Sequence, residues 1–357
     1  MLVNIYRLCS LLKCTCSLLL VGSLSISGLA QSEEKKLNSS ESLAATNSTG
    51  YLNHPEFLKF LDEVTKTDGH SKEKLLALFA SAERKDSILE AIAKPAEKTF
   101  TWARYRKIFI TEDRINKGIE FYKQYKSDLQ RAEKVYGVPA SIIVAIIGVE
   151  TRYGHHRGNY RVLDALATLG FDYPPRAKFF RGQLQQFLLL EKEAGINLTE
   201  AMGSYAGAMG FPQFIPSSYR HYAVDFDADQ KIDLLNNPVD AIGSVANYFK
   251  EHRWQTGKPV ASPARYLKTP NKKNTLDSML NQDLKPKYTV ADFTAQGLVP
   301  DFELGNTLSA TGLKLEGENG IEYWIGLHNF YVITRYNHSH LYALAVHQLS
   351  TALAEKL

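Results

Sequence analysis

The sequence predicts a mainly α (α+β) protein, in which a helical chain carries one small antiparallel β insertion. Two observations support this fold class. Between residues 51 and 257, apolar side chains recur at intervals of three and four, which is the spacing of amphipathic helices. Between residues 258 and 322 this spacing stops, and the short segments 287–291 and 313–316 alternate with period two, as strands do.

The composition is that of an ordinary globular protein, with 44% hydrophobic and 22% charged residues among 357. A chain of this length can form two or three packed units. The formal net charge is only +4, and the sequence contains no dense basic run. These two features argue against a nucleic-acid partner.

Residues 1–30 have the pattern of an export signal. Arg7 and Lys13 supply positive charge, residues 17–29 are apolar and small, and Gly28-Leu29-Ala30 fits a signal-peptidase site. We therefore expect a cleaved signal peptide and a periplasmic mature protein. The alternative for this segment is an uncleaved anchor helix.

All three cysteines, Cys9, Cys14 and Cys16, lie inside this signal. The mature chain is therefore expected to form no disulfide and to use no thiol chemistry or cysteine metal site. A lipid anchor is not expected, because none of these cysteines follows the apolar run beside a cleavage site. Removing residues 1–30 leaves 40 basic and 38 acidic residues, a net charge of +2. Residues 31–50 are polar and predict a flexible tether.

Residues 51–135 predict an N-terminal helical domain. Helical spacing is clear in three segments: 55–64, 71–93 and 112–136. Between the last two, Phe100–Ile110 interleaves aromatic residues with Arg104 and Arg106. Such a segment either lines a ligand groove or packs in the core, and its residues alone leave both alternatives open.

The segment Ser141–Gly154 is apolar on every side, which predicts a buried helix after Pro139 that ends near Gly154. At its end stands one carboxylate, Glu150. Burial disfavours an ionised acid, so we expect the pKa of Glu150 to rise above about 4.3. An acid that stays protonated near neutral pH can serve as a general acid. The alternative is that Glu150 marks the point where the helix meets solvent.

Two further stretches are unusual. Gly203–Tyr219 contains glycines, prolines and four aromatic residues, which favours an irregular loop that is either structural or part of a site. His155 and His156 are adjacent and lack the i, i+4 spacing of helical metal ligands, so a metal is not expected there.

Asp225–Asp233 places carboxylates at positions 1, 3, 5 and 9, which is the alternation of a calcium loop. The pattern is imperfect: Gln230 stands at position 6, where glycine is usual, and Asn236 at position 12, where glutamate is usual. A closing ligand would have to come from further on, for example from Asp240. The alternative is a solvated acidic turn.

The remaining helices are expected in four segments: 162–169, 177–194, 238–252 and 339–354. Together these features give one buried acid, a Gly/Pro/aromatic loop, a candidate cation loop and many tyrosines. Nucleophilic triads, phosphate loops and zinc motifs are not apparent in the sequence. A groove rich in aromatic residues around one acid suits glycosidic cleavage. Most glycosidases need two carboxylates, but one suffices if a hydroxyl of the sugar attacks in place of water.

Four ordered motifs resemble the membrane-bound lytic murein transglycosylase B family: Ile146–Gly154, Gly203–Tyr219, Pro238–Phe249 and Asn329–Asn337. The resemblance spans essentially all of 51–357. It implies a lysozyme-like catalytic core (136–257), a small β domain (258–322) and a C-terminal segment (323–357) that returns to the core. It also implies cleavage of the β-1,4 bond between N-acetylmuramic acid and N-acetylglucosamine in peptidoglycan, leaving 1,6-anhydromuramoyl ends without using water.

The resemblance assigns Glu150 as the sole catalytic residue, first as acid and then as base. By motif match, the side chains expected to bind substrate are Ser204, Gln213, Tyr248, Tyr336, Asn337, Tyr342, Tyr105 and Arg176. The family's calcium ligands match Asp225, Asp227, Asp229, the carbonyl of Lys231, and Asp240. The chain departs from the family in one extra residue within 234–237 and in lacking a lipid-attachment cysteine.

Two rival functions remain open from the sequence. One is a hydrolytic muramidase that uses water in the same groove, and the other is a non-catalytic peptidoglycan-binding scaffold. For the leading function we expect glycan strands of peptidoglycan as substrate, structural Ca²⁺, no organic cofactor and a monomer. Proteins of cell-wall synthesis or remodelling are expected as further partners.

Overall fold

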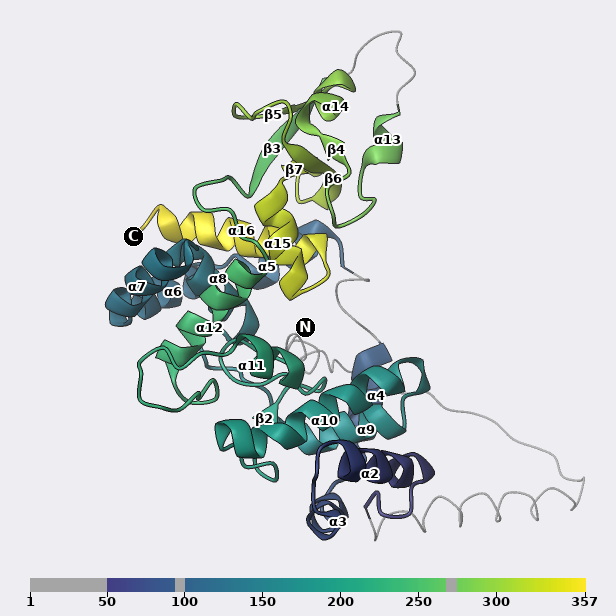
Figure 1. Ribbon diagram of the computed structural model, residues 1–357. Helices are drawn as coiled ribbons and strands as arrows, with labels where there is room; N and C mark the ends of the chain where they lie inside the picture. Colours follow the sequence, from purple (N-terminus) through teal and green to yellow (C-terminus); the bar gives the residue numbers. More distant parts are fainter. Residues whose placement is uncertain (1–49, 94–99, 268–274) are drawn as a thin grey trace, which may run out of the picture.

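The computed structural model describes residues 50–93, 100–267 and 275–357 (Figure 1). The expected signal peptide (1–30) and, apart from Gly50, the expected tether (31–50) lie outside the described residues. The β-sheet lies at one end of the molecule and the first helices at the other, with the helices that carry the candidate site between them.

The first helices are α2 (Pro55–Thr67), α3 (Lys72–Ala80) and α4 (Asp86–Ala93). The expectation of continuous helix over 71–93 is wrong at residues 81–85. There the backbone N–H of Glu83 donates to Asp164 and that of Lys85 donates to Thr168, both on a later helix. These tertiary bonds replace the helical ones, so the chain turns between α3 and α4.

The next helices are α5 (Trp102–Phe109), α6 (Glu112–Gln124) and α7 (Lys126–Tyr136). A single helix was expected over 112–136, but the chain leaves helical geometry at Tyr125, with φ −111° and ψ 29°. The ring of Tyr125 packs on Phe121, with 4.8 Å between their centroids. The apolar spacing continues across this break, which is why the sequence pattern does not reveal it.

The helix α8 (Ala140–Thr151) is the centre of the core, and every residue in it except Ser141 is buried. The all-round apolar segment therefore forms the buried helix that its pattern predicts. Helices α6, α7 and α12 (Pro238–Glu251) pack against it. The next helices are α9 (Val162–Phe171), α10 (Ala177–Ala194) and α11 (Pro216–Tyr222), of which α9 and α11 pack on α10. Short elements complete this part: η2 (Pro174–Arg176) and the paired strands β1 (Tyr160–Arg161) and β2 (Met202–Gly203).

A five-stranded sheet follows, with order β4-β6-β7-β3-β5 and antiparallel pairing throughout. Its strands are β3 (Ala261–Tyr266), β4 (Tyr288–Thr289), β5 (Leu298–Pro300), β6 (Ser309–Gly317) and β7 (Gly320–Gly326). Only two residues of the expected strand 287–291 are in strand geometry. Val290 begins the helix α14 (Val290–Ala295), because Thr289 and Asp292 form a capping box.

The two faces of the sheet pack on different partners, as period-two alternation requires. Leu313, its cross-strand neighbour Trp324, and Leu315 pack into the main core. Tyr323 and Ile325 point to the other face, which packs on α14 and the short helix α13 (Leu276–Met279). The sheet is thus held against the helical core by one face.

The chain then returns to the core through α15 (His328–Tyr336) and α16 (His340–Ala354). Helix α16 packs along α8 and against α5, below the sheet in Figure 1. In the described part of the chain, no single helix meets the length and hydropathy expected of a membrane span. The pair α7 and α8 meets them only when taken together, and it is bent by 114°.

Candidate active site

Glu150 lies in the last turn of α8 and is only 1% exposed. Its Oε1 accepts a 2.6 Å hydrogen bond from the hydroxyl group of Tyr342 on α16, which is fully buried. Beyond Glu150 the helix ends at Arg152, in left-handed geometry with φ 52°. The carboxylate does not mark a solvent boundary, so that alternative is wrong.

A stack of tyrosines extends from Tyr342. The ring of Tyr336 lies 6.4 Å from that of Tyr342 at an interplanar angle of 10°, and Tyr248 meets Tyr336 edge-on at 4.7 Å. Burial, followed by the charge of Glu150, raises the pKa of Tyr342 and of Tyr336 well above the ordinary value. Both hydroxyl groups therefore stay protonated and act as hydrogen-bond donors near Glu150.

Backbone carbonyls fix the two outer tyrosines. The hydroxyl of Tyr336 donates to the carbonyl of Pro212 at 2.6 Å, and that of Tyr248 donates to the carbonyl of Arg335 at 2.6 Å. The first of these bonds ties the loop 203–219 to α15. On the other side, the Thr151 hydroxyl donates to the carbonyl of Phe211 at 3.0 Å. The loop is therefore anchored directly beside Glu150.

The side chains of Ser204 and Gln213 shape this loop from within. The Ser204 hydroxyl oxygen accepts the N–H of Ala206 and of Ala208 at 3.3 and 3.1 Å. Gln213 has φ 50°, and its side-chain amide donates to the carbonyls of Gly210 and Arg157. Both residues are nearly or fully buried, at 2% exposure or less. In this structure, Ser204 and Gln213 therefore stabilise the conformation of the loop through hydrogen bonds to its backbone.

Of the other expected site residues, Asn337 follows Tyr336 directly and is mostly buried. Tyr105 is 1% exposed, packs on Phe109 and lies close enough to raise the pKa of Tyr342, after the larger effects of burial and Glu150. Trp102, Tyr105 and Phe109 are all buried, which supports core packing for this face of α5. Tyr105 thus lies in the buried layer behind Tyr342.

Arg176 lies apart from the tyrosine stack. It is exposed, and its guanidinium lies 4.4 Å from the ring centroid of Phe179 and 5.1 Å from that of Phe180. It lines a cavity of about 720 Å³ together with other residues of η2, α10 and α11, among them Gln183, Gln186 and Ser217. No residue lining this cavity belongs to the Glu150 cluster.

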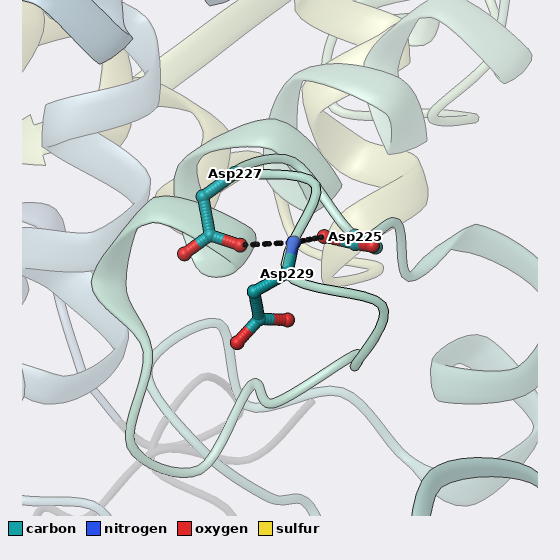
Figure 2. A group of neighbouring side chains, drawn as sticks. All are labelled: Asp225, Asp227 and Asp229. Atoms are coloured by element: carbon teal, nitrogen blue, oxygen red, sulfur yellow. Dashed lines mark hydrogen bonds between the residues drawn. The ribbon is translucent and has the colours of Figure 1, made fainter.

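The candidate cation loop gathers Asp225, Asp227 and Asp229, whose ligand oxygens lie within 4.8 Å of one another (Figure 2). The N–H of Asp229 donates to carboxylate oxygens of Asp225 and Asp227, as the dashed lines in Figure 2 show. Gln230 adopts φ 72°, the left-handed geometry for which glycine is the usual residue. Three converging carboxylates are a donor set that fits a hard divalent cation such as Ca²⁺.

Asp240 and Lys231 are placed differently. Asp240 is fully buried, and its two oxygens accept the N–H groups of Phe226 and Asp233, each at 2.8 Å. Burial raises the pKa of Asp240, and the negative charges of Asp227 and Asp225 raise it further. The two hydrogen bonds from Asp233 and Phe226 act in the opposite direction. Lys231 donates its N–H to Asp229. Within the described residues, the three-carboxylate group thus excludes Asp240, which organises the loop from behind.

Sequence reasoning missed three residues around Glu150. Arg114, Thr151 and Arg335 were not singled out. The guanidinium of Arg114 donates to the carbonyls of Gly148 and Ile108, so it joins α8 to the end of α5. Thr151 and Arg335 stand inside quoted motifs, so adjacency to assigned residues was an available signal. Arg114 carries no such signal, because its acceptors are backbone carbonyls.

Known proteins match this chain over most of its length. Residues 53–351 match the family described as Transglycosylase SLT domain. Membrane-bound lytic murein transglycosylase B of Escherichia coli is 45% identical over 313 residues, covering 85% of this chain and 84% of that protein.

Solved structures agree with this match. Catenated lytic transglycosylase SltB1 from Pseudomonas aeruginosa has a TM-score of 0.80 and 49% identity, over 86% of this chain and 99% of that one. Escherichia coli lytic transglycosylase Slt35, solved in complex with calcium, has a TM-score of 0.78 and 45% identity, over 88% and 97%.

Two of the solved neighbours carry peptidoglycan-like ligands. The E. coli Slt35 was also solved with bulgecin A. P. aeruginosa SltB3, with 29% identity and a TM-score of 0.72 over 84% of this chain and 79% of that one, was solved with NAG-NAM-pentapeptide. From the family match, the close relative and the shared lysozyme-like fold, this chain belongs to the SLT-domain lytic transglycosylases, in the lytic murein transglycosylase B family that its motifs resemble.

Proposed function

We propose that this enzyme cleaves the β-1,4 bond between N-acetylmuramic acid and N-acetylglucosamine in peptidoglycan and leaves a 1,6-anhydromuramoyl end. The observation that carries the proposal is the buried Glu150 with its Tyr342 hydrogen bond. The other buried carboxylates among the described residues, Asp164 and Asp240, are engaged elsewhere. Asp164 binds Arg161 and the N–H of Glu83, and Asp240 organises the cation loop.

One carboxyl group can perform both proton transfers in sequence. In the first step, Glu150 donates its proton to the glycosidic oxygen as the bond from C1 to that oxygen breaks. In the second, the Glu150 carboxylate removes the proton of the C6 hydroxyl of the muramic acid while O6 bonds to C1. The two steps return Glu150 to its protonated form, and no water is consumed.

Tyr342 has a defined role in this scheme. Its hydroxyl occupies Oε1 of Glu150, so the transferred proton is carried on the other carboxyl oxygen, Oε2. The same hydrogen bond stabilises the carboxylate that forms after the first step. Tyr248, Tyr336 and Asn337, with the loop bearing Ser204 and Gln213, form the surroundings in which the sugar is held, and Tyr105 supports Tyr342 from behind.

We also propose that Asp225, Asp227 and Asp229 hold a structural Ca²⁺ ion, which would neutralise three converging negative charges. The calcium complex of E. coli Slt35 supports this assignment. The export pattern of residues 1–30 and a cell-wall substrate support a periplasmic location. The division into a helical domain, a lysozyme-like core and a small β domain is proposed with the boundaries expected from the sequence.

Mass spectrometry of the sugar products from purified peptidoglycan tests the proposed reaction. The wild-type protein should release anhydromuramoyl products, and folded Glu150→Gln should release none. Reducing ends from the wild type would replace the proposal with a hydrolytic muramidase. Anhydro products from both proteins would remove Glu150 from the mechanism.

A further inference from the structure

Three basic side chains form what we call the basic cluster: Arg335 and His338, which lie next to the tyrosine stack, and Arg176, whose charge acts on His338. The three come from two distant parts of the chain. Arg335 is in the last turn of α15, His338 follows three residues later, and Arg176 ends η2. Among residues 50–93, 100–267 and 275–357, no carboxylate lies within ion-pair distance of any of the three.

The position of Arg335 is tied to the candidate active site. Its backbone carbonyl accepts the hydroxyl of Tyr248, and the next residue is Tyr336. Its guanidinium Nη1 donates to Nε2 of His338 at 3.2 Å. Because arginine can only donate, Nε2 is the acceptor, and the His338 ring is held neutral in this pair. Among the residues that the structure describes, this is the only hydrogen bond of the Arg335 guanidinium, so its other N–H groups can bind a ligand.

Arg176 connects this pair to the cavity. Burial lowers the pKa of His338, and the positive charges of Arg335 and Arg176 act in the same direction. Arg176 also lines the cavity of about 720 Å³, whose wall includes the polar residues Gln183, Gln186 and Ser217. A ligand that extended from this cavity to Arg335 would meet two guanidinium groups, first that of Arg176 and then that of Arg335.

We propose that Arg335 and His338, together with Arg176, bind carboxylate groups of the peptides attached to the glycan strand. This inference rests on the proposed function, since it names the part of the substrate that the basic cluster selects. The sugars of a peptide-bearing strand are uncharged, so the anionic groups of that substrate are on its peptides. A guanidinium without an acidic partner can bind a carboxylate through two parallel hydrogen bonds.

A purely structural role for Arg335 makes a different prediction. As a basic residue in the last turn of α15, Arg335 also interacts favourably with the negative end of the helix dipole. If this were its only role, replacing Arg335 would lower the stability of the protein and would weaken the binding of every substrate by the same factor. Selective loss of peptide-bearing substrate separates the two roles.

The test measures binding in the Glu150→Gln background, where strands are not consumed. Glycan strands bearing peptides are compared with stripped strands, whose peptides have been removed by an amidase and whose freed lactyl carboxylates have then been converted to neutral amides. Arg335→Gln and His338→Gln are expected to weaken binding of the peptide-bearing strands by about tenfold, the usual size for a lost hydrogen bond to a charged group. Binding of stripped strands should change less than twofold. Arg265→Gln is the matched control, because it removes a positive charge from an exposed arginine on β3. It should leave both affinities unchanged.

Equal losses on both kinds of strand, or no loss on either, would overturn the proposal. Melting temperatures check that each variant is folded, and Arg335→Lys, which keeps the charge but loses the planar fork, gives a second variant should Arg335→Gln fold poorly. Failure of the proposed function is seen separately. If the wild type releases no anhydro products, the proposed reaction is wrong. The binding comparison would still show whether the basic cluster binds the peptides.

Discussion

The hydroxyl group of Tyr342 donates a 2.6 Å hydrogen bond to Oε1 of Glu150, and the two residues are 192 positions apart in the sequence. Both side chains are buried, so water competes little for this bond. The bond joins α8 to α16, the two helices that pack along each other in the core. The catalytic acid is therefore positioned by the C-terminal helix.

Tyr342→Phe should lower kcat by about 10- to 100-fold with little change in KM, because a hydrogen bond to a charged group contributes about 1.5–3 kcal/mol. Steady-state kinetics on peptidoglycan fragments measure this. Tyr219→Phe is a matched control, since Tyr219 is also buried and donates to the carbonyl of Ile232, away from Glu150. It should lose stability but keep its kcat, and an equal loss of kcat in both variants would contradict the assigned role of Tyr342.

Arg114→Met should reduce both stability and kcat. Arg114 is mostly buried, its pKa is lowered to about 10 by burial, and it donates to the carbonyls of Gly148 and Ile108. Removing it takes a charged donor from both carbonyls, a loss of about 1.5–3 kcal/mol, and frees the turn of α8 that carries Glu150. Among the described residues, the carbonyl of Gly148 then keeps only the N–H of Arg152 as a donor. Denaturant unfolding and kcat are measured together.

Arg131→Met is the control for this prediction. Arg114 lies 5.2 Å from the ring centroid of Phe109, and Arg131 likewise lies 3.7 Å from that of Phe226. Arg131 donates to the carbonyl of Phe226, beside the cation loop, and to no carbonyl of α8. It should reduce stability without reducing kcat. If Arg114→Met retained full kcat under conditions where it is folded, Arg114 would have no part in placing Glu150.

Calcium should raise the melting temperature, because an ion that binds only the folded state stabilises it by mass action, by about 2.7 kcal/mol at 100 times Kd. Asp229→Asn should abolish most of this rise. Asp233→Asn is the control, since Asp233 bonds the N–H groups of Leu235 and Asn236 and lies outside the three-carboxylate group. It should lower the melting temperature but keep the calcium-dependent rise. A calcium response unchanged by Asp229→Asn would place the ion elsewhere.

Local patterns predicted what local forces determine. The helix α8 follows from its all-round apolar run, and α10 and α12 follow from their spacing. The two breaks in the helices could not be predicted in this way. The break at 81–85 depends on hydrogen bonds to Asp164 and Thr168, and the break at Tyr125 accompanies the packing of its ring on Phe121. These contacts exist only in the folded chain.

The same division holds at the candidate site. Glu150 could be found from its apolar surroundings, and the acidic alternation of 225–233 was visible. Tyr342 could be named only through the family resemblance, since nothing local indicates that residue 342 meets residue 150. Arg114 could not be found at all, because backbone carbonyls have no sequence signature.

The helix that carries Tyr342 also carries two partly buried histidines, His340 and His347. Burial lowers the pKa of His347 on α16 to about 4, and its ring meets that of Trp324 on β7 edge-on, with 6.1 Å between the centroids. Burial also lowers the pKa of His340, against the opposing effect of Asp283. Protonating either histidine in the folded state is therefore unfavourable.

Stability should consequently fall as the medium is acidified. The folded pKa of His347, about 4, lies below its unfolded value of about 6.5, so the unfolded state binds more protons between them. The contribution of His347 is fully present above about pH 6.5 and is lost as the pH falls toward 4, by about 3 kcal/mol in total. Urea unfolding of His347→Gln at pH 7 and at pH 4.5 should show a smaller drop in the free energy of unfolding than the wild type. His155→Gln, at an exposed position, should keep the wild-type drop, and an unchanged drop in His347→Gln would assign the acid sensitivity to other groups.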